Sequence, residues 1–161
     1  MQEIPYNSDA AVAYARRWAL GRNPAYYNFD NVGGDCTNFV SQCIYAGARI
    51  MNFTPVFGWY YRSSYDRTAS WSGVEYLYKF LVNNQSIGPY AYIVPREKIR
   101  PGDIVQLGSE NSGYTHSAVI TAASSSTVLV AAHTEDALDR PLDSYVYEAV
   151  RFLHVEGVRV K

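Results

Sequence analysis

The sequence has few cysteines, almost no net charge and no long hydrophobic run. Only two of its 161 residues are cysteine, which excludes a disulfide framework. Lysine and arginine number 14 against 15 aspartates and glutamates, and no block of like charges occurs. This balance argues against a nucleic-acid partner. No apolar run approaches the length of a membrane span, so we expect no membrane insertion.

The chain begins Met-Gln-Glu-Ile-Pro and lacks the basic and apolar regions of a signal peptide. Two locations therefore stay open: the cytoplasm, or the outside of the cell as one domain of a longer secreted protein. With 48% hydrophobic and 18% charged residues, the sequence from 1 to 161 is typical of one globular domain. Its oligomeric state is not indicated.

The most informative stretch runs from Gly33 to Gly47. Asp35 is a residue type that caps helices, and Gly47 is typical of a helix end. Between them, apolar side chains recur with helical spacing at Phe39, Val40, Cys43 and Ile44. The pattern predicts a helix with Cys36 in its first turn, where unpaired N–H groups favour a thiolate. Cys36 is therefore a candidate nucleophile, and the alternative is a small buried hydrophobic residue.

The run Gly-Gly-Asp-Cys-Thr-Asn-Phe-Val-Ser-Gln, residues 33–42, resembles the nucleophile motif of the family called Putative amidase domain. That family resembles the NlpC-type cell-wall peptidases, with the motif Asp-Cys-Ser-Gly-Phe/Leu-Val, among the papain-like cysteine hydrolases. The resemblance implies hydrolysis of amide or peptide bonds through an acyl-enzyme, with peptidoglycan peptides as substrates and no cofactor. It also implies a location at the cell wall if the domain belongs to a secreted protein.

Two histidines bracket a predicted β-hairpin, with strands over residues 114–122 and 127–133 and a serine-rich turn between them. Pairing Ala122 with Thr127 makes the numbers of paired residues sum to 249, which places His116 opposite His133. Paired residues point to the same face, so the two imidazoles are expected side by side. A register slip of one residue would destroy this arrangement.

These residues fit a catalytic triad in which Cys36 attacks, His116 moves the proton and His133 orients His116. The NlpC-type enzymes have this Cys-His-His pattern, so the resemblance implies the same roles. Asp136 is the rival for the third position. A zinc site formed by the same cysteine and two histidines is a further alternative, but no spacing signature supports it.

Three further residues are candidates for contact with substrate. By resemblance, Tyr26 matches a tyrosine that donates to the oxyanion, and Asp35 matches an aspartate that binds a substrate amine. Their alternatives are loop packing for Tyr26 and a helix cap for Asp35. Trp59 lies in an aromatic segment without clean periodicity and is either a groove wall or part of the core. Asp30 stands where papain-type enzymes carry a glutamine, so a second oxyanion donor is not identified.

The order of elements predicts an α+β fold. Helices are expected at about residues 9–20, 36–47 and 72–83, followed by antiparallel strands that carry the histidines. A Pro-Gly-Asp-Ile-Val run at residues 101–105 resembles the element before the histidine strand of NlpC-type enzymes. Two other functions stay open: an acyltransferase that uses the same triad, and an inactive binding module on the same fold.

Overall fold

The computed structural model describes all residues from 1 to 161. It contains four α-helices, namely α1 (Ser8–Trp18), α2 (Cys36–Ala48), α3 (Ala69–Ser72) and α4 (Val74–Asn83). The strands are β1 (Gln2–Ile4), β2 (Tyr61–Ser63), β3 (Asp66–Arg67), β4 (Gly88–Val94), β5 (Ile104–Ser109), β6 (Gly113–Ala123), β7 (Val128–Ala132), β8 (Ala137–Pro141) and β9 (Ala149–Val160). Short 3₁₀ helices cover Arg96–Lys98 and Leu142–Ser144.

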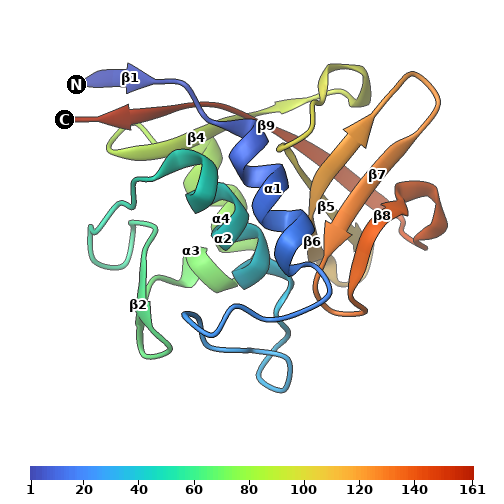
Figure 1. Cartoon of the computed structure of the whole chain (residues 1–161), viewed down its shortest axis with the longest axis horizontal. Coiled ribbons are helices and arrows are strands. Elements are labelled where there is room, and N and C mark those ends of the chain that lie inside the picture. The colour runs from blue at the N-terminus through green and yellow to red at the C-terminus, as the bar shows by residue number, and fades with distance from the viewer.

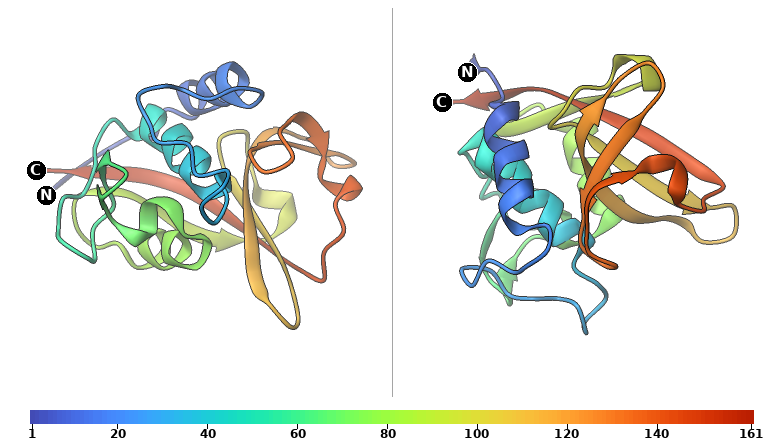
Figure 2. Two further views of the ribbon diagram at one scale, coloured as in Figure 1. Left: turned by 90° about the horizontal axis from the view of Figure 1, so that it is seen from below. Right: turned by 45° about the vertical axis from the view of Figure 1, so that its right-hand side comes forward.

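Seven strands form one antiparallel sheet in the order β1-β9-β5-β6-β7-β8, with β4 on the other edge of β9. Figure 1 shows β9 running across the molecule, the helices grouped in the middle, and β6, β7 and β8 together at one end. Both termini lie close together at the opposite end, because β1 pairs with the end of β9 (Figures 1 and 2). β2 and β3 form a separate two-stranded sheet. No helix is both long and apolar enough to span a membrane.

Alternate residues of β6 face two different hydrophobic clusters. Val119 belongs to the larger cluster, which α2 and α4 share with the sheet, whereas Ala118 and Ile120 belong to a second cluster on the other face. The sheet is therefore buried on both sides in this region. Each side chain of β6 therefore lies either on the face toward α2 or on the face away from it.

The predicted α+β organisation is confirmed at the level of a mixed fold with few helices and a largely antiparallel sheet. The Asn7 side chain caps α1 by accepting a hydrogen bond of 3.0 Å from the Ala10 N–H. α2 begins at Cys36, as predicted, but it continues past Gly47 and ends where Arg49 adopts a left-handed conformation with φ 63°. The third predicted helix is divided between α3 and α4.

The predicted register of the β6–β7 hairpin is wrong by one residue. Val119 pairs with Ala131, and Ile120 pairs with Val130, so the paired numbers sum to 250. The turn has the expected four residues but lies one position later, because Ala123 pairs with Val128 and these numbers sum to 251. A bulge at Thr121 then lowers the sum to 250. This register, continued by two residues, places His133 opposite Ser117 and not opposite His116.

Candidate active site at the start of helix α2

Cys36 is the first residue of α2. Gly33 and Gly34 precede it with φ of 84° and 96°, a backbone conformation that glycine adopts without strain. The first helical hydrogen bond, 3.0 Å long, runs from the Phe39 N–H to the Asp35 carbonyl. Cys36 keeps 8% of its surface exposed, whereas Cys43 has none, and burial raises the pKa of the Cys43 thiol. Of the two thiols, Cys36 is thus the accessible one.

Asp35 and His133 form a buried ion pair directly before Cys36. His133 Nδ1 lies 2.5 Å from Asp35 Oδ2, and both side chains are almost fully buried. The imidazole also stacks on Phe39, with ring centroids 4.1 Å apart. Asp35 stands at the N-cap position, but its side chain makes no capping hydrogen bond. The predicted cap is wrong because the carboxylate turns toward β7 instead of the helix N–H groups.

Both nitrogens of His133 face hydrogen-bond acceptors. Nε2 lies 2.8 Å from the Trp18 carbonyl, and Nδ1 lies against the Asp35 carboxylate. That carboxylate also accepts hydrogen bonds from the Phe29 N–H and Asn38 Nδ2, at 2.9 and 2.8 Å. Because a carbonyl can only accept, His133 carries a proton on Nε2, and it shares the proton of the second hydrogen bond with Asp35.

The predicted substrate-binding role of Asp35 does not agree with this geometry. Asp35 is 1% exposed, and its two oxygens already have three donors from the chain. A substrate amine would have to displace one of them. Asp35 is thus a partner of His133 in this structure.

Arg22 joins the loop before α2 to the segment after β7. Its guanidinium makes two hydrogen bonds of 2.9 Å to Asp136 and two more to Asp30, and it lies 3.7 Å from Asp35 Oδ2. The pKa of Asp30 is lowered mainly by its hydrogen bonds to Arg22. Asp136, the predicted rival for the third catalytic position, is therefore paired with an arginine and contacts neither imidazole.

His116 lies on the face of β6 that is turned away from α2. Its ring packs near Tyr145, 5.7 Å between centroids, beside a cavity of about 340 Å³ that Glu135 also lines. Its Nε2 is buried without a hydrogen-bond partner. Burial, and then the positive charge of Arg140, lowers the pKa of His116. Its neighbour Ser117 points to α2, with Ser117 Oγ 3.1 Å from Thr37 Oγ1. The fold thus separates His116 from Cys36 and His133.

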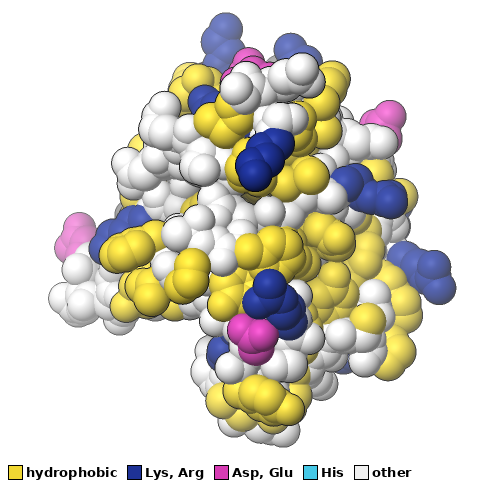
Figure 3. Space-filling view, turned by 90° about the vertical axis from the view of Figure 1, so that its left-hand side faces the viewer, with side chains coloured by type: hydrophobic (Ala, Val, Ile, Leu, Met, Phe, Trp, Pro, Cys, Tyr) yellow, Lys and Arg dark blue, Asp and Glu magenta, His cyan; other side chains and the backbone are white.

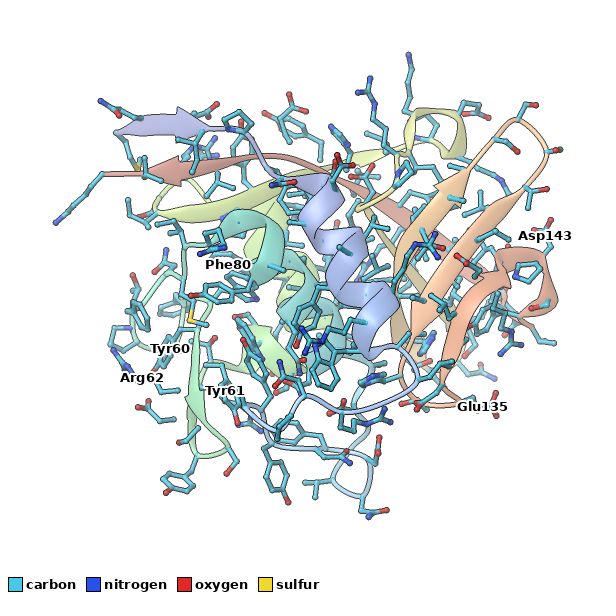
Figure 4. The ribbon with its side chains drawn as sticks, in the orientation of Figure 1. Tyr60, Tyr61, Arg62, Phe80, Glu135 and Asp143 are labelled. Atoms are coloured by element: carbon cyan, nitrogen blue, oxygen red, sulfur yellow. The ribbon has the colours of Figure 1, made fainter.

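Trp59 is part of the core. It has no exposed surface, its ring packs on Trp71 and Phe80, and its Nε1 donates to Ser41 Oγ at 3.1 Å. The predicted groove wall at this residue is wrong, because the aromatic segment turns Trp59 inward. The exposed members of that segment are Phe53, Val56, Phe57 and Tyr65. Figure 4 shows Tyr60 and Arg62 at the side of the molecule opposite Glu135 and Asp143.

Tyr26 lies in an aromatic cluster on another side of α2. Its ring stacks on Trp71 at 6.0 Å and lies 5.1 Å from Tyr61. Burial, and then the neighbouring tyrosines, raises the pKa of Tyr26 to about 12, so its hydroxyl keeps the proton that a donor needs. Trp71 Nε1 donates to Asn38 Oδ1 at 2.9 Å, which attaches the cluster to the first turn of α2. The oxyanion role of Tyr26 stays a prediction.

No three histidine, cysteine, aspartate or glutamate side chains converge as a metal site would require. The third histidine, His154, lies elsewhere in the sheet. Its Nδ1 is 2.9 Å from Asp103 and its Nε2 is 3.0 Å from Glu156. His154 is therefore held by two carboxylates and has no connection to Cys36.

Residues 5–155 match the protein family described as Putative amidase domain. The chain belongs to this family. A similar sequence is "Uncharacterized protein YhbB" of Bacillus subtilis (strain 168), 32% identical over 136 residues, which are 81% of this chain and 42% of that protein. The chain thus spans less than half the length of this relative. No solved structure matches.

Membership of this family indicates hydrolysis of amide bonds, that is, of C–N bonds. The motif around Cys36 predicted that membership correctly. The ion pair between Asp35 and His133 was not predicted, because it joins residues 98 positions apart. The register that allows it depends on where the serine-rich turn lies and on the bulge at Thr121.

Proposed function

We propose that this amidase domain hydrolyses amide bonds through a thioester on Cys36, with His133 as the proton carrier and Asp35 as its orienting partner. One observation carries the proposal: the first residue of α2 is a cysteine with 8% of its surface exposed, and it follows directly on Asp35, which is paired with His133. The papain-like fold and the cell-wall substrate rest on the resemblance of the Cys36 motif to NlpC-type enzymes.

The position of Cys36 favours the thiolate. The N–H groups at the start of α2 and the positive end of the helix dipole both stabilise an anion there. Both nitrogens of His133 face hydrogen-bond acceptors, as those of the imidazolium would in a resting thiolate–imidazolium pair. In this proposal the proton has left the thiol before substrate binds.

The chemical steps follow from these two groups. The Cys36 sulfur attacks the amide carbon and forms a C–S bond, and the C–N bond breaks as His133 gives its Nε2 proton to the leaving amine. A water molecule then attacks the thioester and returns a proton to His133, which releases the acid and regenerates the thiolate. Asp35 stays ionised and holds the Nδ1–H throughout.

His133 is better placed than His116 for the proton transfer. To reach substrate, its Nε2 must leave the Trp18 carbonyl, which keeps a hydrogen bond of 3.2 Å from the Gly21 N–H. His116 would need β6 to shift by one residue, because it faces the opposite side of the sheet. A side-chain rotation is a much smaller change than a register shift. We therefore assign to His133 the role that the sequence suggested for His116.

The aromatic cluster beside α2 supports a peptide substrate. The Tyr61 hydroxyl accepts a hydrogen bond of 2.7 Å from the Tyr27 N–H, and the Tyr27 carbonyl accepts one of 2.9 Å from Asn38 Nδ2. Figure 3 shows the side of the molecule that lies on the left in Figure 1, where β2 is found. Hydrophobic side chains and separate lysine or arginine side chains lie on this face. Aromatic side chains suit the apolar parts of an extended peptide, and the basic ones suit acidic groups such as those of bacterial wall peptides.

The proposal is tested by the release of amine from cell-wall peptides by five proteins: wild type, Cys36→Ala, Cys43→Ala, His133→Ala and His116→Ala. Cys36→Ala and His133→Ala should each lower kcat/KM by at least about a thousandfold, because each removes a reacting group. Cys43→Ala is the matched control on the same helix and should stay active. Activity that depends on His116 and not on His133 would contradict the assignment of the proton carrier.

A further inference from the structure

A buried chain of hydrogen bonds leads from Arg151 in β9 to the sulfur of Cys36. Arg151 Nε donates to Gln106 Oε1 at 2.9 Å, and Gln106 Nε2 donates to Ser117 Oγ at 3.1 Å. Ser117 Oγ lies 3.1 Å from Thr37 Oγ1, which lies 3.7 Å from Cys36 Sγ. Neither Ser117 nor Gln106 has any exposed surface, and Thr37 is 1% exposed. Water therefore does not compete for these bonds.

The Gln106 amide sets the direction of the hydrogen bonds at the start of this chain. The Gln106 amide is fixed, because its oxygen accepts from a guanidinium that can only donate and its nitrogen also donates to the Val74 carbonyl at 3.0 Å. Ser117 Oγ therefore accepts from Gln106, which leaves its own O–H to donate to Thr37 Oγ1. In this arrangement Thr37 Oγ1 accepts from Ser117 and its O–H is left to donate to Cys36 Sγ.

The far end of the chain is held by a positive charge. The Arg151 guanidinium lies between the rings of Tyr78 and Tyr114, at 3.5 and 3.8 Å, and donates to Glu75 at 2.8 Å. A chain of aligned hydrogen bonds polarises each of its members, so a cation at one end strengthens the donor at the other. The arrangement aims the Thr37 hydroxyl at the sulfur.

We propose that this chain stabilises the thiolate of Cys36, with Thr37 as the donor to the sulfur and Ser117 and Gln106 as positioning residues that act through Thr37. The inference deepens the proposed function, because it concerns the same sulfur. It does not need an identified substrate, since the ionisation of a thiol is visible in its reactivity. Gln106 is far from Cys36 in the sequence, so no local motif reveals its role.

The test is the rate of alkylation of Cys36 by iodoacetamide as a function of pH, with the site of labelling confirmed by peptide mapping. Thr37→Val removes the hydroxyl and keeps the shape of the side chain. It should move the midpoint of the profile up by about one pH unit, so that labelling below the midpoint is about tenfold slower. Thr37→Ser should restore the wild-type profile. Ser41→Ala, which deletes another buried hydroxyl of α2, should leave the profile unchanged.

Gln106→Glu tests the direction of the chain. A glutamate in this place accepts from Ser117 where the amide donated, so Ser117 accepts from Thr37 and the sulfur loses its proton donor. We expect the same upward shift as in Thr37→Val, and Ser117→Ala provides the corresponding measurement if the glutamate variant does not fold. A profile of folded Thr37→Val that superimposes on that of wild type overturns the inference. A shifted profile in a protein that cleaves no amide would contradict the proposed function but support the chain.

Discussion

At the scale of single residues, the contact between Asp35 and His133 determines what the site can do. It holds the His133 ring beside the start of α2 and leaves no free oxygen on Asp35 for a substrate amine. Buried ion pairs add little net stability as a whole, but removal of one partner leaves an uncompensated charge in the interior. The pair is therefore a site where a small chemical change should have a large effect.

Asp35→Asn should lower the free energy of unfolding by about 3–5 kcal/mol, because it leaves the His133 cation buried without its counter-ion. A simple helix cap would leave the free energy of unfolding nearly unchanged, since asparagine caps as well as aspartate. Urea denaturation followed by circular dichroism measures the change. Asp136→Asn is the matched control, since its partner Arg22 keeps Asp30 and the pair is partly exposed, and it should cost no more than about 1 kcal/mol. Equal losses in the two variants would contradict the buried ion pair.

His116 should make the stability of the protein depend on pH. Its pKa in the folded state is lowered by burial, so below its ordinary value of about 6.5 the unfolded chain binds the proton more readily. The contribution of buried, neutral His116 to the free energy of unfolding is therefore present at high pH and is lost as the pH falls. The stability difference between wild type and His116→Gln should therefore shrink from about pH 8 to about pH 5. Urea titrations of both proteins at several pH values measure it, and a constant difference would show that His116 is not buried as a neutral base.

At the scale of elements, the packing of α2 against the start of α1 depends on Gly47. A Cβ atom at this position would lie 2.6 Å from Tyr6 Cε1 and 2.7 Å from the Asn7 carbonyl oxygen. Gly47 thus permits a close approach within the helix, where the sequence had suggested a helix end. The Asn7 N–H also donates to the Gly47 carbonyl at 3.0 Å, which fixes the two segments together.

Gly47→Ala should destabilise the protein by about 1–3 kcal/mol, because the added methyl group has no room and the backbone oxygen of Asn7 cannot move aside. The usual effect of this change inside a helix is a gain of about 0.5–1 kcal/mol. Gly21→Ala, where nothing lies within 4 Å of the added atom, is the control and should be nearly neutral. Thermal melting of the two variants shows whether each change raises or lowers the stability of the protein. A stabilised Gly47→Ala would contradict the close contact.

Helices and strands in which apolar residues recur at regular spacing were predictable from the sequence, and those without such a pattern were not. The apolar spacing of α1, α2 and α4 and the runs of β5, β6 and β7 identified these elements to within a few residues. β1 has three exposed residues, and β8 contains Asp139 with φ 54° and Arg140, so neither carries a hydrophobic pattern. The register of β6 and β7 depended on a bulge at Thr121, which local sequence does not mark.

At the scale of the whole molecule, the sheet brings together residues that are distant in the chain. β7 delivers His133 to Asp35, and β6 delivers Ser117 to Thr37, so the first turn of α2 is held from two neighbouring strands. The Cys36 motif predicted the family and the start of α2 at Cys36, since both are local properties of the sequence. The partners of Cys36 were not predictable to the same degree, because each depends on the register of strands far along the chain.

The most direct test of the central claim, that Cys36 carries out covalent catalysis, is mass spectrometry of the intact protein after rapid acid quenching with a cell-wall peptide or an activated ester of one. We predict a mass increase equal to the acyl part of the substrate, which peptide mapping assigns to Cys36. The adduct should persist in Cys43→Ala and be absent in Cys36→Ala. Amide hydrolysis that continues in Cys36→Ala without any adduct would contradict the account.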